Sequence, residues 1–574
     1  MMEKSIDLLK KYWRKDLFRP MQKEVIDHYN CGHDTIVLLP TGGGKSLCYQ
    51  LPAVMKKGAT LVICPIISIM QDQIIELGKK GIKAMFFESG YDKNSINRQF
   101  DNARYGNYKL IYFSPERLLD KIFLNQLKTL EISGIAIDEA HCVSEWGNDF
   151  RPAFKTIKKI KKILPEVPIM ALSASATPKV IMDMTSDLGM KDPKVFKTSF
   201  ERKNIKYQVI FTENKIELIV NTLHDYKESC IIYCKTRIET EKTTIKLKKA
   251  GLSCDYFHGG LDKVMKKQKL ESWKREQTLI MVATSAFGMG IDKGNVRKVF
   301  HLTIPESLES YYQETGRAGR DGKPSSAMLL VKPQNKTNHY NKFIKYLPVK
   351  KELKTYFKNL CNYLHIPYGE GQGMQFNLNL KDFCETYQFQ EKKILKYFEI
   401  FDREGIFEFQ HFNKSMTFVK LSCSHNDAIE RIKRNDSGGK LIQFLMRNFE
   451  GIFTSEKKIN LNQISDIIGV KEGKIDEQLK LLKNQKIIEL VSTNTDVKIY
   501  WKKPREDDFI LNMVSKKQKA YNKLKKVKIK KMLDFTFDLT KCKRNFILSY
   551  FGEERKEKCK NCSAESCIGS SETL

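Results

Sequence analysis

The sequence has no long hydrophobic run. Its longest apolar stretch, TLVICPIISIM, contains Pro65 and is shorter than the roughly 20 residues that a membrane-spanning helix needs. The first residues, MMEKSIDLLKKYWRKD, are charged throughout and include no apolar core of a signal peptide. These absences exclude the common signs of membrane insertion and secretion, so we expect a cytoplasmic protein.

Acidic residues are scarce relative to basic ones. The 574 residues include 100 Lys and Arg against 68 Asp and Glu, a net charge of +32. A field of that sign attracts polyanions, which favours nucleic acid as the partner. A lysine-biased proteome that leaves only a solvated basic surface is the alternative. The chain is otherwise typical of globular proteins, and its length predicts about three to five domains.

Few of the cysteines have the close spacing of a metal site. Most of the fourteen stand singly in apolar segments, as Cys64 and Cys230 do, where a small buried thiol is the ordinary expectation. The last four have the spacing C-x16-C-x2-C-x4-C, which suits a tetrahedral zinc site, and a reducing cytoplasm favours zinc over disulfides. The predicted zinc ligands are Cys542, Cys559, Cys562 and Cys567.

Up to about residue 340, short β-branched runs such as TIVLL, GIAIDEA and SCIIYC alternate with amphipathic helical stretches. This alternation is typical of a parallel sheet built from βαβ units. The pattern restarts after the charged segment FERKNIK. We therefore predict two α/β domains, at residues 1–202 and 203–340, with a cleft at their junction.

Beyond about residue 350, a pattern of two helices and two strands occurs twice, 81 residues apart, so that Glu391 aligns with Glu472 and Ile394 with Ile475. In each copy the two strands are expected to form a hairpin, through the turns HFNKS and STNTD. This plan indicates winged-helix-like modules, which commonly bind duplex DNA. Two unrelated helical packing modules are the alternative. The predicted modules occupy residues 341–425 and 426–504.

A glycine-rich loop, PTGGGKS, follows the strand TIVLL and precedes a predicted helix, the context that a P-loop needs. Leu39 stands where the usual pattern has its first glycine. The glycines let backbone N–H groups close around a phosphate, Lys45 can neutralise the β and γ phosphates, and Ser46 can ligate Mg²⁺. The predicted nucleotide-binding residues of the loop are Thr41, Gly42, Gly43, Gly44, Lys45 and Ser46.

Two carboxylates, Asp138 and Glu139, follow the apolar strand GIAI. Parallel sheets bind their ligands at the carboxyl ends of strands. We predict that Asp138 holds Mg²⁺ through water and that Glu139 orients and deprotonates the water that attacks the γ phosphate. A surface DEAH without function is the alternative, and the P-loop upstream argues against it.

The second α/β domain contains QETGRAGRDG at residues 313–322, which we expect to open on a helix. Arg317 and Arg320 are three residues apart and would share one helix face. Guanidinium groups that reach across a cleft suit a transition state whose charge spreads over the γ phosphate. Ion pairs with structural carboxylates are the alternative. Either arginine could be the main arginine finger, the side chain that reaches the γ phosphate.

These features resemble superfamily 2 helicases, and others resemble the RecQ family of ATP-dependent DNA helicases. LFRPMQ at residues 17–22 is similar to that family's segment ahead of the P-loop. The resemblance implies that Gln22 reads the adenine edge, that Arg19 packs on the base, and that Gln313 also contacts the nucleotide. Arg14 and Lys15 replace the family's glycine and aromatic residue, which removes an adenine-stacking ring.

CVSEWGNDFRP, after DEAH, resembles the family's aromatic-rich loop, which couples DNA contact to ATP hydrolysis. Glu145 and Asn148 stand where the family usually has glutamine and histidine. The implied DNA-stacking residues are Trp146, Phe150 and Arg151. A purely structural role for the tryptophan is the alternative. PIISIMQDQ, SPER, SAT, YCKTR and ATSAFGMGID are similar to further family motifs.

Near the carboxyl end, KRNFILSYFGE looks like the RecQ zinc subdomain. This domain, predicted at residues 505–574, follows the winged-helix region instead of preceding it, and its last spacing is x4 where the family commonly has x2. Just upstream, KKQKAYNKLKKVKIKK is rich in lysine. It is either a helix that tracks phosphates or a solvated one.

The sequence thus predicts two tandem RecA-like parallel-sheet domains, winged-helix-like modules and a small zinc domain. The resemblance implies a nucleoid-associated enzyme that uses ATP, Mg²⁺ and Zn²⁺, moves 3′ to 5′ on single-stranded DNA and unwinds duplex DNA in repair or recombination. It also implies a wing hairpin that splits base pairs, with His411 and Phe412 at the tip of the first predicted wing. The alternatives are an RNA helicase or remodelling ATPase, and a DNA-binding regulator with a vestigial ATPase.

Overall fold

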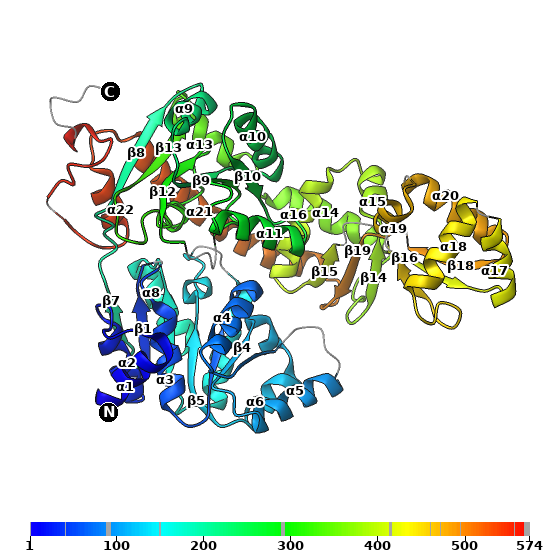
Figure 1. Cartoon of the computed structure of the whole chain (residues 1–574), viewed down its shortest axis with the longest axis horizontal. Helices are drawn as coiled ribbons and strands as arrows, with labels where there is room; N and C mark the ends of the chain where they lie inside the picture. Colours follow the sequence, from blue (N-terminus) through cyan, green and yellow to red (C-terminus); the bar gives the residue numbers. More distant parts are fainter. Residues whose placement is uncertain are drawn as a thin grey trace. The chain divides into compact units, whose positions relative to one another are not determined.

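The computed structural model describes residues 2–40, 42–87, 93–147, 151–288, 293–411, 416–434, 436–459, 461–470, 472–493, 495–555 and 557–567. The chain forms two compact units, one of Met1–Leu347 with Lys523–Leu574 and the other of Pro348–Asn522 (Figure 1). Within the described ranges, no helix combines the length and the apolar character that crossing a bilayer requires.

The first unit begins with a parallel sheet of seven strands. The strands are β1 (Thr35–Leu38), β2 (Ala59–Ile63), β3 (Ala84–Phe86), β4 (Leu110–Phe113), β5 (Ile132–Ile137), β6 (Ile169–Ser173) and β7 (Lys194–Lys197), in the order β3-β4-β2-β5-β6-β1-β7. The helices are α1 (Met2–Leu8), α2 (Gln22–Asn30), α3 (Lys45–Met55), α4 (Ile67–Lys79), α5 (Lys93–Tyr105), α6 (Lys121–Leu127), α7 (Lys158–Ile163) and α8 (Pro178–Leu188).

Both faces of this sheet are buried, which explains why its central strands are continuous apolar runs. In β1, Ile36 and Leu38 pack in one core, while Val37 and Leu39, just after the strand, pack in a separate core on the other face. The sheet is therefore covered on both sides and presents its strand ends to ligands.

A second parallel sheet follows in the same unit. Its strands are β8 (Ile205–Phe211), β9 (Ser229–Tyr233), β10 (Cys254–Phe257), β11 (Ile280–Ala283), β12 (Val296–His301) and β13 (Ser325–Val331), in the order β10-β11-β9-β12-β13-β8. The helices are α9 (Lys215–Leu223), α10 (Arg237–Lys249), α11 (Lys263–Lys274), α12 (Leu308–Thr315) and α13 (Lys336–Ile344). The two sheets confirm the predicted pair of RecA-like folds.

The carboxyl-terminal segment returns to this second sheet. The long helix α21 (Asp507–Phe537) begins in the second unit and ends in the first, where α22 (Lys543–Tyr550) follows it. Edge strand β8 forms a parallel bridge between Tyr207 and Cys562, and Ser563 Oγ accepts a hydrogen bond from Val209 N at 2.9 Å. The cysteine-rich segment therefore covers an edge that would otherwise expose unpaired backbone groups.

The second unit contains two small antiparallel sheets. Its elements are α14 (Lys350–Tyr363), β14 (Gln375–Leu378), α15 (Leu380–Thr386), α16 (Glu391–Arg403), β15 (Phe407–His411), β16 (Met416–Leu421), α17 (His425–Lys433), α18 (Ser437–Asn448), β17 (Lys457–Ile459), α19 (Leu461–Ile468), α20 (Glu472–Asn484), β18 (Ile488–Thr493) and β19 (Val497–Trp501). The sheets have the orders β14-β19-β15 and β17-β16-β18.

The prediction that each copy forms its own hairpin is wrong. β15 pairs with β19, and β16 pairs with β18. Each copy of the repeat contributes a helix pair, α15–α16 or α19–α20, and packs with a three-stranded sheet, but the third strand of each sheet comes from the other copy. The second module is therefore inserted into the wing of the first, between β15 and β19.

The chemistry of the two cores explains this exchange. Trp501, fully buried in β19, lies among aromatic rings of the first module, with its ring centroid 5.2 Å from that of Phe407 and 5.9 Å from that of Phe357. The inward residues of β16, Val419 and Leu421, pack in the second core, which is almost entirely aliphatic. Each third strand thus fits the core of the other module because close packing requires matching volumes.

Candidate active site

The glycine-rich loop joins β1 to α3, and two side chains from upstream hold it. Gln22 Nε2 donates a hydrogen bond to Gly44 O at 3.0 Å, and the Arg19 guanidinium donates to Gly42 O. Gly44 has a φ of 79°, and a Cβ there would lie 2.3 Å from Gln22 Nε2, so this position requires glycine. The remaining predicted loop residues are Gly43, Ser46 in the first turn of α3, and Thr41, which lies outside the described residues.

Lys45 is enclosed by this loop. Its ammonium donates to the carbonyl oxygens of Leu39 at 3.2 Å and Pro40 at 3.5 Å. Burial lowers the pKa of Lys45, while the nearby carboxylates of Glu139 and Asp138 act in the opposite direction. A partly buried amine at a glycine-rich loop that precedes a helix, with two carboxylates nearby, suits the binding of a polyphosphate with Mg²⁺.

Asp138 and Glu139 follow β5, at the same edge of the sheet as the loop, because β5 and β1 both pair with β6. Burial, and then the adjacent Glu139 carboxylate, raise the pKa of Asp138. Glu139 Oε2 lies 3.3 Å from His141 Nδ1, and that nitrogen lies 2.9 Å from Ser173 Oγ. His141 thereby ties the second carboxylate to the end of β6.

Arg317 and Arg320 lie in the turn after α12, so the prediction that they share a helix face is wrong. Arg317 is buried and donates to the carbonyl oxygen of Gly288 in its own domain. Arg320 points to the other domain, since a Cβ added to Gly42 would lie 3.3 Å from its Cδ. The charge of Arg320 also lowers the pKa of Lys45. The structure therefore separates the two arginines, and Arg320 is the one beside the glycine-rich loop.

Gln313, predicted as a nucleotide contact, lies in α12 and donates through Nε2 to Ser175 Oγ at 3.0 Å. Ser175 follows β6 in the first domain, so this hydrogen bond joins the two RecA-like domains. In the same helix, Glu314 Oε2 lies 2.8 Å from Nε2 of the buried His301. α12 thus connects the second sheet to the first domain.

The aromatic-rich loop exposes its tryptophan. Trp146 is 42% exposed, and its backbone N–H donates to Ser144 Oγ at 3.0 Å. Arg151 Nη1 donates to the carbonyl oxygen of Pro65 at 2.9 Å, which links the loop to a second family-like segment. The exposed indole is available for base stacking, whereas the arginine is engaged with protein. Phe150 and Asn148 lie outside the described residues.

Helix α21 contacts both domains of the first unit through Lys528. Lys528 Nζ donates to Gly147 O in the aromatic-rich loop at 2.6 Å and lies 3.3 Å from Glu309 Oε1 in α12. Tyr550 OH donates to the same Glu309 oxygen at 2.8 Å. This lysine is therefore neither a phosphate-tracking nor a solvated side chain.

The four carboxyl-terminal cysteines form a cluster. Tetrahedral zinc–thiolate sites have bonds of about 2.3 Å, which places their sulfurs about 3.8 Å apart. Backbone N–H groups of Lys543 and Asn561 donate to cluster sulfurs, each at 3.4 Å, which favours thiolates. The residues therefore fit zinc. The Sγ atoms within 4.8 Å of one another are those of Cys542, Cys559, Cys562 and Cys567.

The predicted wing tip is not a tip. His411 pairs with Val497 on β19, and its Nε2 lies 4.0 Å from Asp496 Oδ2, where the chain returns from the inserted module. Phe412 lies outside the described residues. Because the strand before this point pairs with β19 and the strand after it with β18, the predicted wing hairpin is wrong, and a strand-separating role of these two residues stays a prediction.

Sequence reasoning missed two residues that connect the site. His141 belongs to the DEAH motif itself, so the motif could have suggested a role for it. Lys528 forms its contacts within a lysine-rich run, where no single lysine stands out. The spacing gives no signal either, because other lysines of the run are also three residues apart, and only the fold pairs Lys525 and Lys528 with Glu306 and Glu309.

Four family models match the chain in sequence order. The DEAD/DEAH box helicase model matches residues 19–184, and the helicase conserved C-terminal domain model matches residues 214–322. The model of the RecQ helicase winged-helix domain of Bacteroidota matches residues 419–492, and the RecQ zinc-binding model matches residues 506–566. The winged-helix match coincides with the inserted second module.

Curated relatives match somewhat more than half of the chain. The ATP-dependent DNA helicase RecQ of Bacillus subtilis is 41% identical over 58% of this chain and 57% of that protein. The ATP-dependent DNA helicase RecQ of Pasteurella multocida is 40% identical over 57% of this chain and 52% of that protein. The chain therefore spans about half the length of these relatives.

Among solved structures, the DNA-bound DUF1998 helicase MrfA is similar with a TM-score of 0.50 and 19% identity, over 60% of this chain and 50% of that one. This likeness concerns the fold alone.

Proposed function

The chain belongs to the RecQ family, and on that premise we propose that it is an ATP-dependent DNA helicase. In this proposal it moves 3′ to 5′ along single-stranded DNA and unwinds duplex DNA in repair or recombination, and its substrate places it at the nucleoid. One observation carries the proposal. Arg320 of the second domain lies against Gly42 of the loop that encloses Lys45. An arginine that crosses to the phosphate-binding loop makes hydrolysis depend on how the domains close.

Nucleotide binding would replace contacts that the protein now makes with itself. Phosphate oxygens would take the place of the backbone carbonyls at the Lys45 ammonium. Arg19 and Gln22 would exchange their hydrogen bonds to the glycine-rich loop for contacts with the adenine. Adenine binding would thereby change the contacts that hold the loop.

Hydrolysis would use the carboxylates after β5. Mg²⁺ held by Ser46 and Asp138 would stabilise negative charge on the phosphates. Glu139 would accept a proton from the attacking water, with its carboxylate oriented by His141. Arg320 would stabilise the charge that develops on the γ phosphate oxygens.

Coupling to DNA would run through the aromatic-rich loop. A base stacked on Trp146 or Phe150 would move a loop that Arg151 and Lys528 connect to other segments. In the second unit, the winged-helix modules would bind duplex DNA. The cysteine cluster would hold Zn²⁺ and keep the carboxyl-terminal segment on β8.

Turnover of ATP measured without nucleic acid, with single-stranded DNA and with RNA tests this proposal. We expect DNA to stimulate turnover several-fold and Glu139→Gln to lower it about 100-fold or more, while ATP binding persists. Stronger stimulation by RNA would favour an RNA helicase or remodelling ATPase. Absence of stimulation by either would contradict the proposal. Duplexes with a 3′ or a 5′ single-stranded tail then test direction, and unwinding of the 5′-tailed substrate alone would contradict 3′ to 5′ movement.

A further inference from the structure

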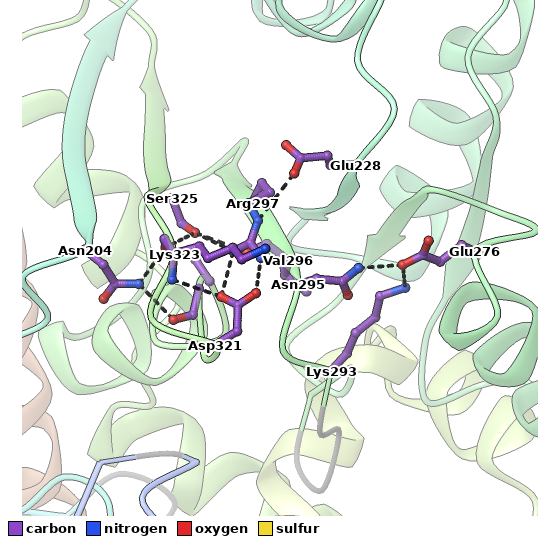
Figure 2. Close-up of polar contacts among 12 residues, drawn as sticks. Asn204, Glu228, Glu276, Lys293, Asn295, Val296, Arg297, Asp321, Lys323 and Ser325 are labelled. Carbon is purple, nitrogen blue, oxygen red and sulfur yellow. Dashed lines mark hydrogen bonds and ion pairs between the residues drawn. The ribbon is translucent and has the colours of Figure 1, made fainter.

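The turn that carries Arg320 is enclosed by a dense set of polar contacts (Figure 2). We propose that Arg297, at the start of β12, is a positioning residue that acts through Asp321 to hold Arg320 beside the phosphate-binding loop. This inference rests on the proposed ATPase function. It assigns a role to a residue outside every motif that the sequence pattern singled out.

The contact between Arg297 and Asp321 is bidentate. Arg297 Nη1 donates to Asp321 Oδ1 at 3.0 Å, and Nη2 donates to Oδ2 of the same carboxylate. The arginine side chain is 7% exposed and the aspartate side chain 28%. The hydrogen bond from Arg297 lowers the pKa of Asp321, so the carboxylate is charged at neutral pH. Two parallel charge-assisted bonds fix orientation as well as distance.

Two further groups hold Arg297 itself. Its Nη1 donates to Ser325 Oγ at 3.1 Å, and its Nε lies 3.5 Å from Glu228 Oε1. Figure 2 shows these partners on opposite sides of the guanidinium. Because the guanidinium is anchored on the sheet, Asp321 is fixed relative to β12 and β13. Asp321 is also the residue next to Arg320.

Backbone contacts hold the other side of the turn. Gly319 N donates to Val296 O at 2.8 Å, beside Arg297 in the chain. Asn204 Nδ2 donates to the carbonyl oxygens of Gly319 and Lys323, both at 2.8 Å. Arg320 therefore projects from a turn that is held on both sides of it. The backbone contacts keep the turn folded without Arg297, and the ion pair sets its orientation.

Orientation is what a transition-state contact requires. A guanidinium that stabilises developing charge gains most when it is already in place, and a displacement of about 1 Å can cost about 100-fold in rate. Arg297→Lys keeps the positive charge but cannot form the bidentate pair. It should therefore loosen Arg320 without removing it.

A comparison of four proteins tests the inference: the full chain, Arg297→Lys, Arg320→Ala, and the double variant. Single-turnover ATP hydrolysis is measured with saturating single-stranded DNA. We expect Arg297→Lys to lower the rate about tenfold, with the KM for ATP changed less than about twofold. In the Arg320→Ala background the same substitution should lower the rate no further, because the residue through which it acts is gone. Arg275→Lys, at an exposed arginine of the same domain, is the matched control and should leave the rate unchanged.

Other outcomes decide against the inference. An equal additional loss in the Arg320→Ala background would show that Arg297 acts independently of that arginine. An unchanged rate in Arg297→Lys would also overturn it. Asp321→Asn gives a second route to the same comparison if Arg297→Lys folds poorly, as measured by its melting temperature. If the proposed ATPase function itself were wrong, the unsubstituted chain would show no DNA-stimulated hydrolysis, and this result differs from every outcome that concerns Arg297.

Discussion

At the scale of single residues, two arginines of one turn have different surroundings. Arg317 is 8% exposed and its guanidinium donates to Gly288 O inside the second domain. Arg320 lies across the domain junction against Gly42. The first is part of a folded core, and the second faces the place where phosphates would bind.

Alanine at each position should therefore have a different effect. Arg320→Ala should lower DNA-stimulated ATP turnover about 1000-fold, as loss of an arginine finger does, with little change in melting temperature. Arg317→Ala, in contrast, should lower the melting temperature, because the buried carbonyl of Gly288 loses its hydrogen-bond donor, at a cost of about 1 to 3 kcal/mol. Turnover and thermal unfolding measured on both variants check this. A drop in melting temperature in Arg320→Ala alone would reverse the assignment.

Sequence reasoning works best for residues whose chemistry fixes their spacing. The proximity of Lys45 to Asp138 and Glu139 could be predicted because a P-loop and a strand-end carboxylate pair are short, contiguous signatures. Arg297 and Lys528 could not, because their partners lie 24 and 381 residues away and only the fold brings them together. The prediction that Arg317 and Arg320 share one helix face is wrong for a local reason. Gly319 has a φ of 53°, which an α-helix does not allow.

At the scale of elements, the lysine-rich helix α21 contacts the rest of the first unit through two of its lysines. Lys525 lies 3.2 Å from Glu306 Oε2, and Lys528 bonds to Glu309 and to the aromatic-rich loop. The helix therefore spans from the loop that is proposed to contact DNA to the helix that precedes the finger turn. Most other lysines of this run are exposed, as the solvated alternative expects, and Lys525 and Lys528 depart from it.

Lys528→Met should uncouple DNA binding from hydrolysis. The change keeps the apolar stem but removes the donor to Gly147 O and the partner of Glu309. We expect stimulation of ATP turnover by single-stranded DNA to fall about tenfold or more, since a charge-assisted hydrogen bond contributes about 1.5 kcal/mol or more. Lys526→Met, at an exposed position of the same helix, is the matched control. ATP turnover titrated with DNA checks this, and an equal effect of both variants would mean that α21 acts through its overall charge.

Zinc should stabilise the segment that covers β8. Three of the four cysteines belong to the same hydrophobic core as Ile205 and Tyr207 of that strand, so loss of the ion should loosen the edge of the second sheet. We expect about one zinc per chain by elemental analysis, and a lower melting temperature after Cys559→Ser or chelation. Cys31→Ser, at an exposed cysteine outside the cluster, is the control. Unchanged zinc content in Cys559→Ser would contradict the assignment.

At the scale of the whole molecule, a repeated pattern does not fix how its copies pair. The offset of 81 residues correctly relates β15 to β18 and α16 to α20. It gives no information on which third strand enters which sheet, because both arrangements satisfy the same local pattern of strands. The deciding feature is a long-range match of volume, since the bulky Trp501 fits the aromatic core of the first module and Leu421 fits the aliphatic core of the second. Parallel βαβ domains leave less freedom, and those could be predicted.

Cysteine pairs distinguish the exchanged pairing from two separate hairpins. Gln410 lies opposite Lys498 in the pairing of β15 with β19, so cysteines at these positions should form an intramolecular disulfide on mild oxidation. In a hairpin through residues 412–415, Gln410 would instead lie opposite Thr417, and that cysteine pair is the matched control. Peptide mass spectrometry of the oxidised monomer identifies the link. A disulfide in the control pair, and none between positions 410 and 498, would mean that each copy keeps its own third strand, which would place Trp501 in an aliphatic core and leave the aromatic core of the first module underfilled.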